Sequence, residues 1–124
     1  MTIISIKHTK SGGILFSGDF KNIKQCLEAA VNNNIDLSYA DLRRARLRGA
    51  NLDAARLNYV TLSGADCTGA NLSEACLQGA DLSHTDLSLA CLCEADMRDT
   101  NMCGATMAGT LVNGANITGA SFGS

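Results

Sequence analysis

A repeat of five residues runs from Ile35 to Ser124 and limits the possible folds more than any other feature. Over this stretch the 124-residue sequence divides into 18 units in one register without an insertion. The third residue of a unit is Leu in 11 units and Met, Cys, Val, Ile or Phe in the others, while the first is Ala in 13. A period of five matches neither an α-helix nor the two-residue alternation of a strand.

The repeat predicts a solenoid. Each unit has one large and one small apolar residue to bury, which is possible only if the chain winds around an axis and successive turns cover one another. The chain has five aromatic residues and neither Pro nor Trp, which argues against a core built on large rings. The apolar fraction of 46% is too high for a disordered chain.

The units ADLRR, ANLSE and ADLSH resemble the A-(D/N)-L-x-x signature of the pentapeptide-repeat family. This resemblance implies an all-β solenoid, a right-handed quadrilateral β-helix with four units and 20 residues per coil, so that the 18 units make about 4.5 coils. With neighbouring strands about 4.8 Å apart, the repeat region is expected to be a rod roughly 20 Å long.

Residues 1–34 precede the repeats and are expected to form a cap on the first coil, with the repeats as a β-helix over 35–124. Two apolar-rich runs, 2–9 and 13–17, predict a hairpin. Asp19 is expected to be the N-cap of an amphipathic helix, in which apolar residues recur at helical spacing from Phe20 to Val31. An open coil end exposes unpaired strand edges and apolar side chains, so a terminal cap favours solubility.

The six cysteines do not predict a disulfide scaffold or a metal site. No two are 20 residues apart, so none stack on adjacent coils, and the outward ones fall on three different faces. A zinc site requires convergent ligands, and we expect free thiols in a reducing cytoplasm. Neither a metal nor another cofactor is expected.

Catalysis is not expected either. Ser83, His84 and Asp86 lie close in sequence, but a catalytic triad requires a sheltered cleft with the imidazole oriented between the other two groups. A convex rod offers no such cleft. The glycines of the repeats fall at the fifth position, where they turn corners, and form no phosphate-binding loop.

Charge is distributed unevenly, although the net charge is only −2. Residues 1–34 and 35–64 each carry +2, residues 65–99 carry −6, and residues 100–124 are uncharged. If residues 20 apart stack, Arg46, Asp66 and Asp86 form one outward column, and Glu74 lies beneath Glu94. These carboxylates are either solvated members of the motif or an anionic surface for a basic partner.

Three groups of residues are candidates for an interaction surface. The acidic candidates are Asp66, Asp81, Asp86, Glu74 and Glu94, and the basic candidates are Arg43, Arg44, Arg46 and Arg48. Leu89 and Leu111 are expected to point outward as an apolar patch. Ile117 and Phe122, in the uncharged last coil, are the candidate face for a homodimer formed end to end.

These features predict a non-catalytic scaffold that binds an unidentified protein through a face of the rod. The alternative is a DNA mimic that binds DNA gyrase and modulates quinolone sensitivity, an activity that the family resemblance implies. Mimicry needs carboxylates that follow the phosphate spacing of about 1.7 Å per charge, and a net charge of −2 falls short of this. We expect no direct nucleic-acid binding, no membrane span, no signal peptide and a cytoplasmic location.

Overall fold

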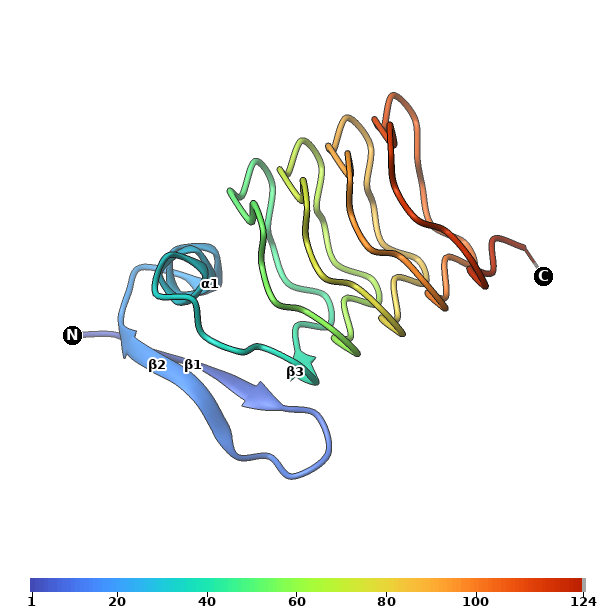
Figure 1. Cartoon of the computed structure of the whole chain (residues 1–124). Coiled ribbons are helices and arrows are strands. Elements are labelled where there is room, and N and C mark those ends of the chain that lie inside the picture. The colour runs from blue at the N-terminus through green and yellow to red at the C-terminus, as the bar shows by residue number, and fades with distance from the viewer. Residues whose placement is uncertain (124) are drawn as a thin grey trace.

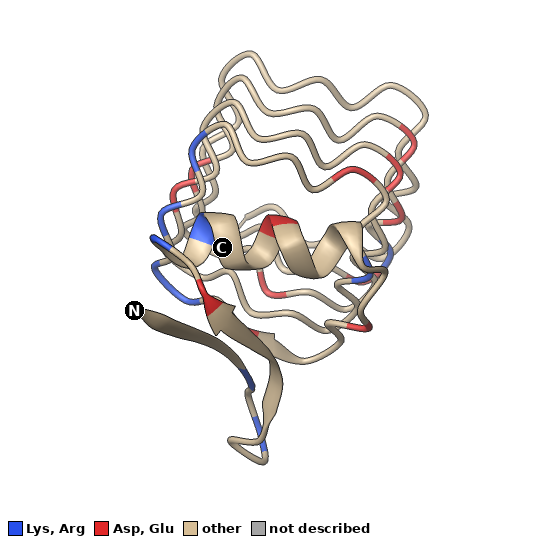
Figure 2. Ribbon diagram, turned by 90° about the vertical axis from the view of Figure 1, so that its left-hand side faces the viewer, with Lys and Arg blue, Asp and Glu red and all other residues tan. Residues whose placement is uncertain are grey.

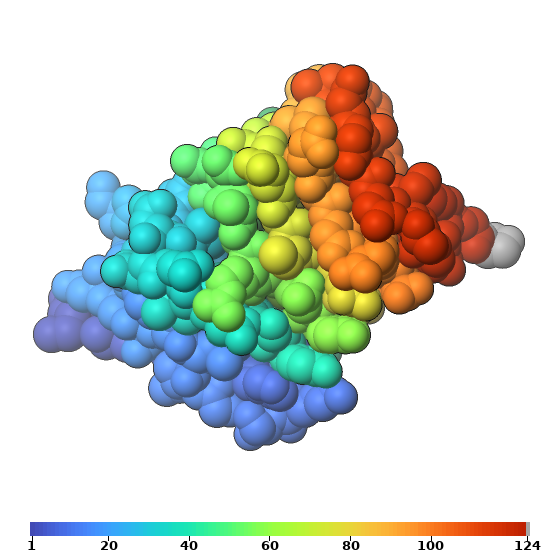
Figure 3. All heavy atoms as spheres, in the orientation of Figure 1, coloured from blue at the N-terminus to red at the C-terminus, as the bar shows by residue number. Residues whose placement is uncertain are grey.

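The computed structural model describes residues 1–123 and has a small folded end followed by a stack of coils (Figure 1). The small end contains strand β1 (Ile3–His8), strand β2 (Ile14–Asp19) and helix α1 (Ile23–Asn32). A short strand, β3 (Ala40–Asp41), lies in the first coil. In Figure 3 the colours pass in bands from blue to red along the molecule, so consecutive coils lie side by side.

The coils are joined by parallel bridges between residues 20 apart, from Asp36 with Arg56 to Asn101 with Ser121. Each bridge involves the second residue of a repeat. The Leu52 N–H donates to the Asn71 carbonyl at 2.8 Å, and the Asn71 N–H donates to the Ala50 carbonyl at 2.9 Å. The predicted circuit of 20 residues is therefore confirmed. Apart from β3, the walls between residues 35 and 120 consist of isolated bridges and not of longer strands, because each repeat there turns again after its third residue.

From Tyr39 to Gly119, the fifth residue of each repeat turns the corner with a positive φ. The value is 68° at Gly69, and it is 59° at Ala54 and 58° at Glu74, which are not glycines. The next N–H closes the turn onto the carbonyl of the third residue, as from Ala70 to Cys67 at 3.0 Å. The backbone hydrogen bonds of the turn thus impose a left-handed conformation even on residues with a Cβ.

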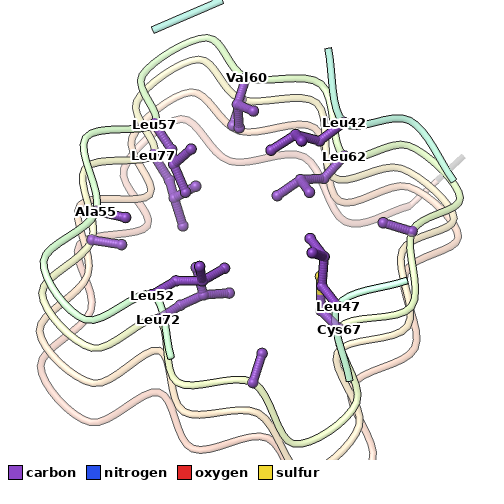
Figure 4. Close-up of a cluster of buried hydrophobic side chains, with 14 of the residues drawn as sticks. Leu42, Leu47, Leu52, Ala55, Leu57, Val60, Leu62, Cys67, Leu72 and Leu77 are labelled. Atoms are coloured by element: carbon purple, nitrogen blue, oxygen red, sulfur yellow. The ribbon is translucent and has the colours of Figure 1, made fainter. Parts of the chain in front are cut away.

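Leucine side chains from all four walls point into the interior, with alanine and other small residues between them (Figure 4). Leu47, Leu52, Leu57 and Leu62 are fully buried. The expectation that every third-position residue is buried is wrong in the last coil. There Val112, Ile117 and Phe122 are 44%, 49% and 48% exposed, because within residues 1–123 no coil lies beyond them.

Residues 1–34 form the predicted hairpin and helix, but the N-cap is Asn22 and not Asp19. The Asn22 Oδ1 accepts the Gln25 N–H at 2.9 Å, whereas Asp19 ends β2 and its Oδ1 accepts the Thr2 N–H at 2.9 Å. The helix packs against the first coil, with Leu27 fully buried in the common core.

Two further contacts tie this end to the coils. The Glu28 carboxylate of α1 accepts the Asn51 N–H at 2.8 Å. Strand β1 lies between β2 and β3, and its Lys7 is paired with Asp41. This pairing continues the hairpin sheet into the first coil. None of the described helices combines the length and the apolar character that a membrane span requires.

Candidate interaction surface

An open pocket of about 900 Å³ lies between the start of α1 and the first coils. Lys24, Arg44, Arg46 and Arg48 line it, and Asp66 is the one carboxylate in its lining among the described residues. We call this site the basic pocket. Figure 2 shows Lys and Arg segments gathered at the left-hand edge of the coils, on the side where the blue segment of α1 lies.

The repeat geometry brings these cations together. Arg44 is the fifth residue of its repeat and turns a corner with φ 59°. Arg46 and Arg48 are the second and fourth residues of the next repeat, and both positions point outward. Asn22 caps α1 and so places Lys24 in the first helical turn beside them. The sequence predicted the arginines as interaction residues but not Lys24, because Lys24 reaches the pocket only through the packing of α1 against the coil.

Electrostatic pairing within the basic pocket is incomplete. Arg48 Nη1 lies 3.5 Å from Asp66 Oδ2. Hydrogen bonds from Thr68, with a smaller contribution from Arg48, lower the pKa of Asp66. Within residues 1–123, Lys24, Arg44 and Arg46 have no carboxylate at salt-bridge distance. The pocket therefore presents three cations that an anionic ligand can reach.

Arg43 lies outside this group, although it is adjacent in sequence. Its guanidinium forms two hydrogen bonds of 2.9 Å with the two carboxylate oxygens of Asp41. The hydrogen bond from Arg43 is also the main reason that the pKa of Asp41 is lowered. Arg43 is thus already neutralised by a residue of its own repeat, which weakens it as an interaction residue.

The acidic candidates of the second position stabilise their own repeats. The Asp66 Oδ1 accepts the Thr68 hydroxyl at 2.6 Å, and the Asp81 Oδ1 accepts the Ser83 hydroxyl at 2.6 Å. The Asp86 Oδ1 accepts the Ser88 N–H at 3.0 Å, and this bond is the main reason that the pKa of Asp86 is lowered. These carboxylates act as turn acceptors, a role that their spacing from Ser or Thr two residues later could have indicated.

The acidic candidates do not converge on one site. Asp66 and Asp86 form a bridge pair on the wall that continues from Arg46, as the column predicted, whereas Asp81 pairs with Asn101 on another wall. Glu74 and Glu94 lie 20 residues apart at a corner, where both have positive φ values of 58° and 62°.

The apolar candidates point outward as predicted, with Leu89 69% exposed and Leu111 56% exposed. Neither lines the basic pocket. Two tyrosine rings stack on neighbouring coils, with the ring centroids of Tyr39 and Tyr59 5.0 Å apart. The Lys10 ammonium lies 4.9 Å from the centroid of the Tyr39 ring.

All six cysteines are free thiols. Burial raises the pKa of Cys67 to about 12, and it also raises the pKa of Cys26. Among residues 1–123, no three His, Cys, Asp or Glu side chains are grouped so that they could hold a metal ion.

Comparison with known proteins relates this chain to repeat proteins of the same kind. Residues 33–66, 50–88 and 85–123 match the description "Pentapeptide repeats", with eight copies. Rfr23, a pentapeptide repeat protein from the cyanobacterium Cyanothece 51142, is 28% identical with a TM-score of 0.65; the match covers 68% of this chain and 58% of Rfr23.

HetL, a pentapeptide repeat protein involved in heterocyst differentiation regulation in the cyanobacterium Nostoc sp. strain PCC 7120, is 37% identical with a TM-score of 0.69. That match covers 70% of this chain and 40% of HetL. The matched region thus corresponds to about half the length of these two proteins. No curated protein matches the sequence significantly.

Proposed function

The chain belongs to the pentapeptide-repeat family, whose members fold as right-handed quadrilateral β-helices, and on this premise we propose that it is a protein-binding module. Its basic pocket receives a short acidic segment of a partner protein. The observation that carries the proposal is the set of three cations, Lys24, Arg44 and Arg46, that have no carboxylate partner within residues 1–123. No catalytic step is part of this function.

The chemistry of the pocket matches carboxylates. A guanidinium presents its N–H donors in a planar fork that binds a carboxylate through two parallel hydrogen bonds. The Arg48–Asp66 pair at 3.5 Å is long, so an incoming carboxylate can compete for Arg48. Exposed ion pairs contribute about 0.2–1 kcal/mol each. Binding therefore depends on several contacts made together and weakens as salt is added.

A short protein segment fits the charge distribution better than a nucleic acid does. The wall that bears Arg46 continues through Asp66 and Asp86, which are paired by successive bridges. Residues 65–99 carry a net charge of −6. A polyanion extended along the rod would therefore meet carboxylates one coil beyond the pocket, whereas a short acidic segment ends before them.

The contacts between α1 and the first coils also support a division of the chain into a cap and a β-helix. We propose that residues 1–34 cap the first coil and that residues 35–124 form the β-helix. The buried Leu27 and the hydrogen bond of 2.8 Å from the Asn51 N–H to Glu28 support this division. The cap also has a part in binding, because Lys24 of α1 completes the pocket.

The proposal is tested by fluorescence anisotropy with a labelled glutamate-rich peptide and the full chain. We expect salt-sensitive binding that Arg44→Gln together with Arg46→Gln weakens roughly tenfold, since two pairs of somewhat under 1 kcal/mol each are lost. The control is Arg98→Gln combined with Arg56→Gln, which removes the same charge away from the pocket, where each arginine already pairs with an aspartate. An equal loss of affinity in both double variants contradicts the proposal.

The alternative of a DNA mimic is tested separately with a gyrase supercoiling assay. The proposed function predicts that the chain changes neither supercoiling nor its inhibition by quinolones. Inhibition of supercoiling, or protection from quinolones, would favour the mimic. Tighter binding of duplex DNA than of the acidic peptide would also contradict a protein-binding pocket.

A further inference from the structure

Cys91 and Cys93 are the second and fourth residues of one repeat, ACLCE. Of the 18 repeats, this is the one with sulfur at both positions. Cys76 has Gln78 as its fourth-position partner, and Cys103 has Asn101 as its second-position partner. The pair therefore differs chemically from every other outward cysteine in the repeats.

The other repeats show how side chains at these two positions are placed. The Asp66 Oδ1 and the Thr68 Oγ1 are 2.6 Å apart. The corresponding distance is 2.7 Å between Asp36 Oδ1 and the Ser38 hydroxyl. Both side chains point outward while the third residue points inward, so positions two and four of a repeat face each other. The same backbone geometry places the Cys91 and Cys93 side chains next to each other on the outward face, and the two thiols influence each other's pKa.

The surroundings distinguish the two sulfurs. The Ser73 Oγ on the preceding coil lies 3.0 Å from the Cys91 Sγ. Hydrogen bonds from Ser73, and then from the backbone and side chain of Cys93, lower the pKa of Cys91. The pKa of Cys93 is raised, chiefly by its hydrogen bond to Cys91. Both residues are partly exposed, so a small reagent in solvent can reach them.

We propose that Cys91 and Cys93 form a redox-active dithiol that a hydroperoxide oxidises to a disulfide within the repeat. Cys91 is the attacking sulfur, because the thiolate is the nucleophilic form of cysteine and its neighbours stabilise that form. Cys93 is the resolving sulfur. This inference does not depend on the basic pocket, which is lined by other residues.

The reaction has two balanced steps. The Cys91 thiolate attacks one peroxide oxygen, the O–O bond breaks, and the leaving oxygen takes a proton to become water or an alcohol. Cys91 is then a sulfenic acid. The Cys93 sulfur attacks the Cys91 sulfur and forms the S–S bond, while the displaced hydroxide leaves as water with the Cys93 proton. The two cysteines together lose two electrons, and the peroxide gains them.

The other cysteines serve as internal controls. Cys26 and Cys67 are fully buried and have raised pKa values. Cys76 and Cys103 are partly exposed like the proposed pair, but neither has a cysteine at the facing position. The Cys103 thiol instead donates to the Gly123 carbonyl at 3.4 Å. Oxidation of these residues cannot close a disulfide within a repeat.

The test is intact-mass spectrometry of the reduced full chain after treatment with hydrogen peroxide. We expect a loss of two hydrogen masses, two fewer free thiols after denaturation, and recovery of both with dithiothreitol. Cys91→Ser and Cys93→Ser should each abolish the loss. In Cys93→Ser the reaction should stop at the Cys91 sulfenic acid, which is seen as a gain of one oxygen mass and is trapped by dimedone. The Cys76→Ser and Cys103→Ser variants should still lose two hydrogen masses.

Three outcomes would overturn the proposal: a natural chain that gains oxygen without losing hydrogen, a mass loss that persists without Cys91 or Cys93, and a loss that requires Cys76 or Cys103. Circular dichroism checks that each variant is folded. Cys93→Ser places at the fourth position the residue found there in the preceding coil, Ser73, so this variant fits the repeat.

Discussion

At the scale of single residues, the fifth position of the repeat is where the backbone adopts a left-handed conformation. Gly69 and Gly79 have φ values of 68° and 69°, and Ala54 has 59°. An L-residue in this left-handed conformation costs roughly 1–2 kcal/mol, which glycine avoids. A side chain at this position also lies over the fifth residue of the next coil, as the Tyr59 ring lies over Gly79.

These facts predict different costs for two similar substitutions. Gly69→Ala should lower the free energy of unfolding by about 1 kcal/mol, because its Cβ meets open space and only the backbone is strained. Gly79→Ala should cost more, because its Cβ would overlap the Tyr59 ring, which is stacked on Tyr39. Urea denaturation measures the loss of stability in both variants. The reverse substitution at a left-handed position, Ala54→Gly, should raise the urea midpoint. Equal losses at Gly69 and Gly79 would contradict this account.

At the scale of the repeat, the second residue accepts hydrogen bonds that hold the following turn. Asp and Asn share this role, since the Asp86 Oδ1 accepts the Ser88 N–H at 3.0 Å and the Asn71 Oδ1 accepts the Ser73 N–H at 3.0 Å. A carboxylate accepts better than an amide, but it loses this advantage when it is protonated. The repeats with Asp are therefore sensitive to acid in a way that those with Asn are not.

Asp86 gives the sharpest test, because no Arg or Lys forms a salt bridge with it within the described residues. Its pKa is lowered in the folded chain, mainly by the Ser88 N–H. A lowered folded pKa stabilises the fold above the unfolded pKa of about 4, and this stabilisation is lost as pH falls through the folded value. Asp86→Asn should therefore reduce the loss of stability between neutral and acidic pH, as measured by urea midpoints.

The matched variant Asp86→Ala removes the acceptor as well as the charge. The free energy of unfolding of Asp86→Ala should be lower than that of the natural chain at neutral pH. The difference should shrink in acid, because the natural chain then loses the charge of Asp86. If Asp86→Asn and the natural chain lost stability equally with falling pH, the carboxylate would not have the role assigned to it.

The period of five was sufficient to predict the bridges, the columns and the outward position of Leu89. The end of the hairpin could not be located in the same way, because Asp19 and Asn22 are both good N-caps. The choice depends on a tertiary contact, the bond of 2.9 Å from the Thr2 N–H to Asp19 Oδ1, which extends β2. The β1–β3 pairing and the place of Lys24 in the basic pocket also depend on how the cap packs.

At the scale of the whole molecule, the two ends differ in charge and in how they are covered. At the N-terminal end, Leu27 of α1 is fully buried in the common core and β1 pairs with β3 of the first coil. The last coil exposes Ile117 and Phe122 to 49% and 48%, and residues 100–124 have no charge. Within residues 1–123 the N–H of Ile117 has no backbone acceptor. This end therefore combines apolar side chains with unpaired backbone groups, the combination that pairs with another strand edge.

We expect two copies of the 124-residue chain to associate through this face, each covering Phe122 of the other. Burying an aromatic side chain contributes about 1.5–3 kcal/mol. Phe122→Glu should therefore raise the dissociation constant at least about tenfold in sedimentation equilibrium. Leu89→Glu is the control, because it adds the same charge to a leucine 69% exposed on a corner of the rod. Dissociation to the same extent in both variants would place the contact elsewhere, and a monomer at all concentrations would contradict association. Only a selective effect of Phe122→Glu would show that the last coil acts as a strand edge that a second coil extends.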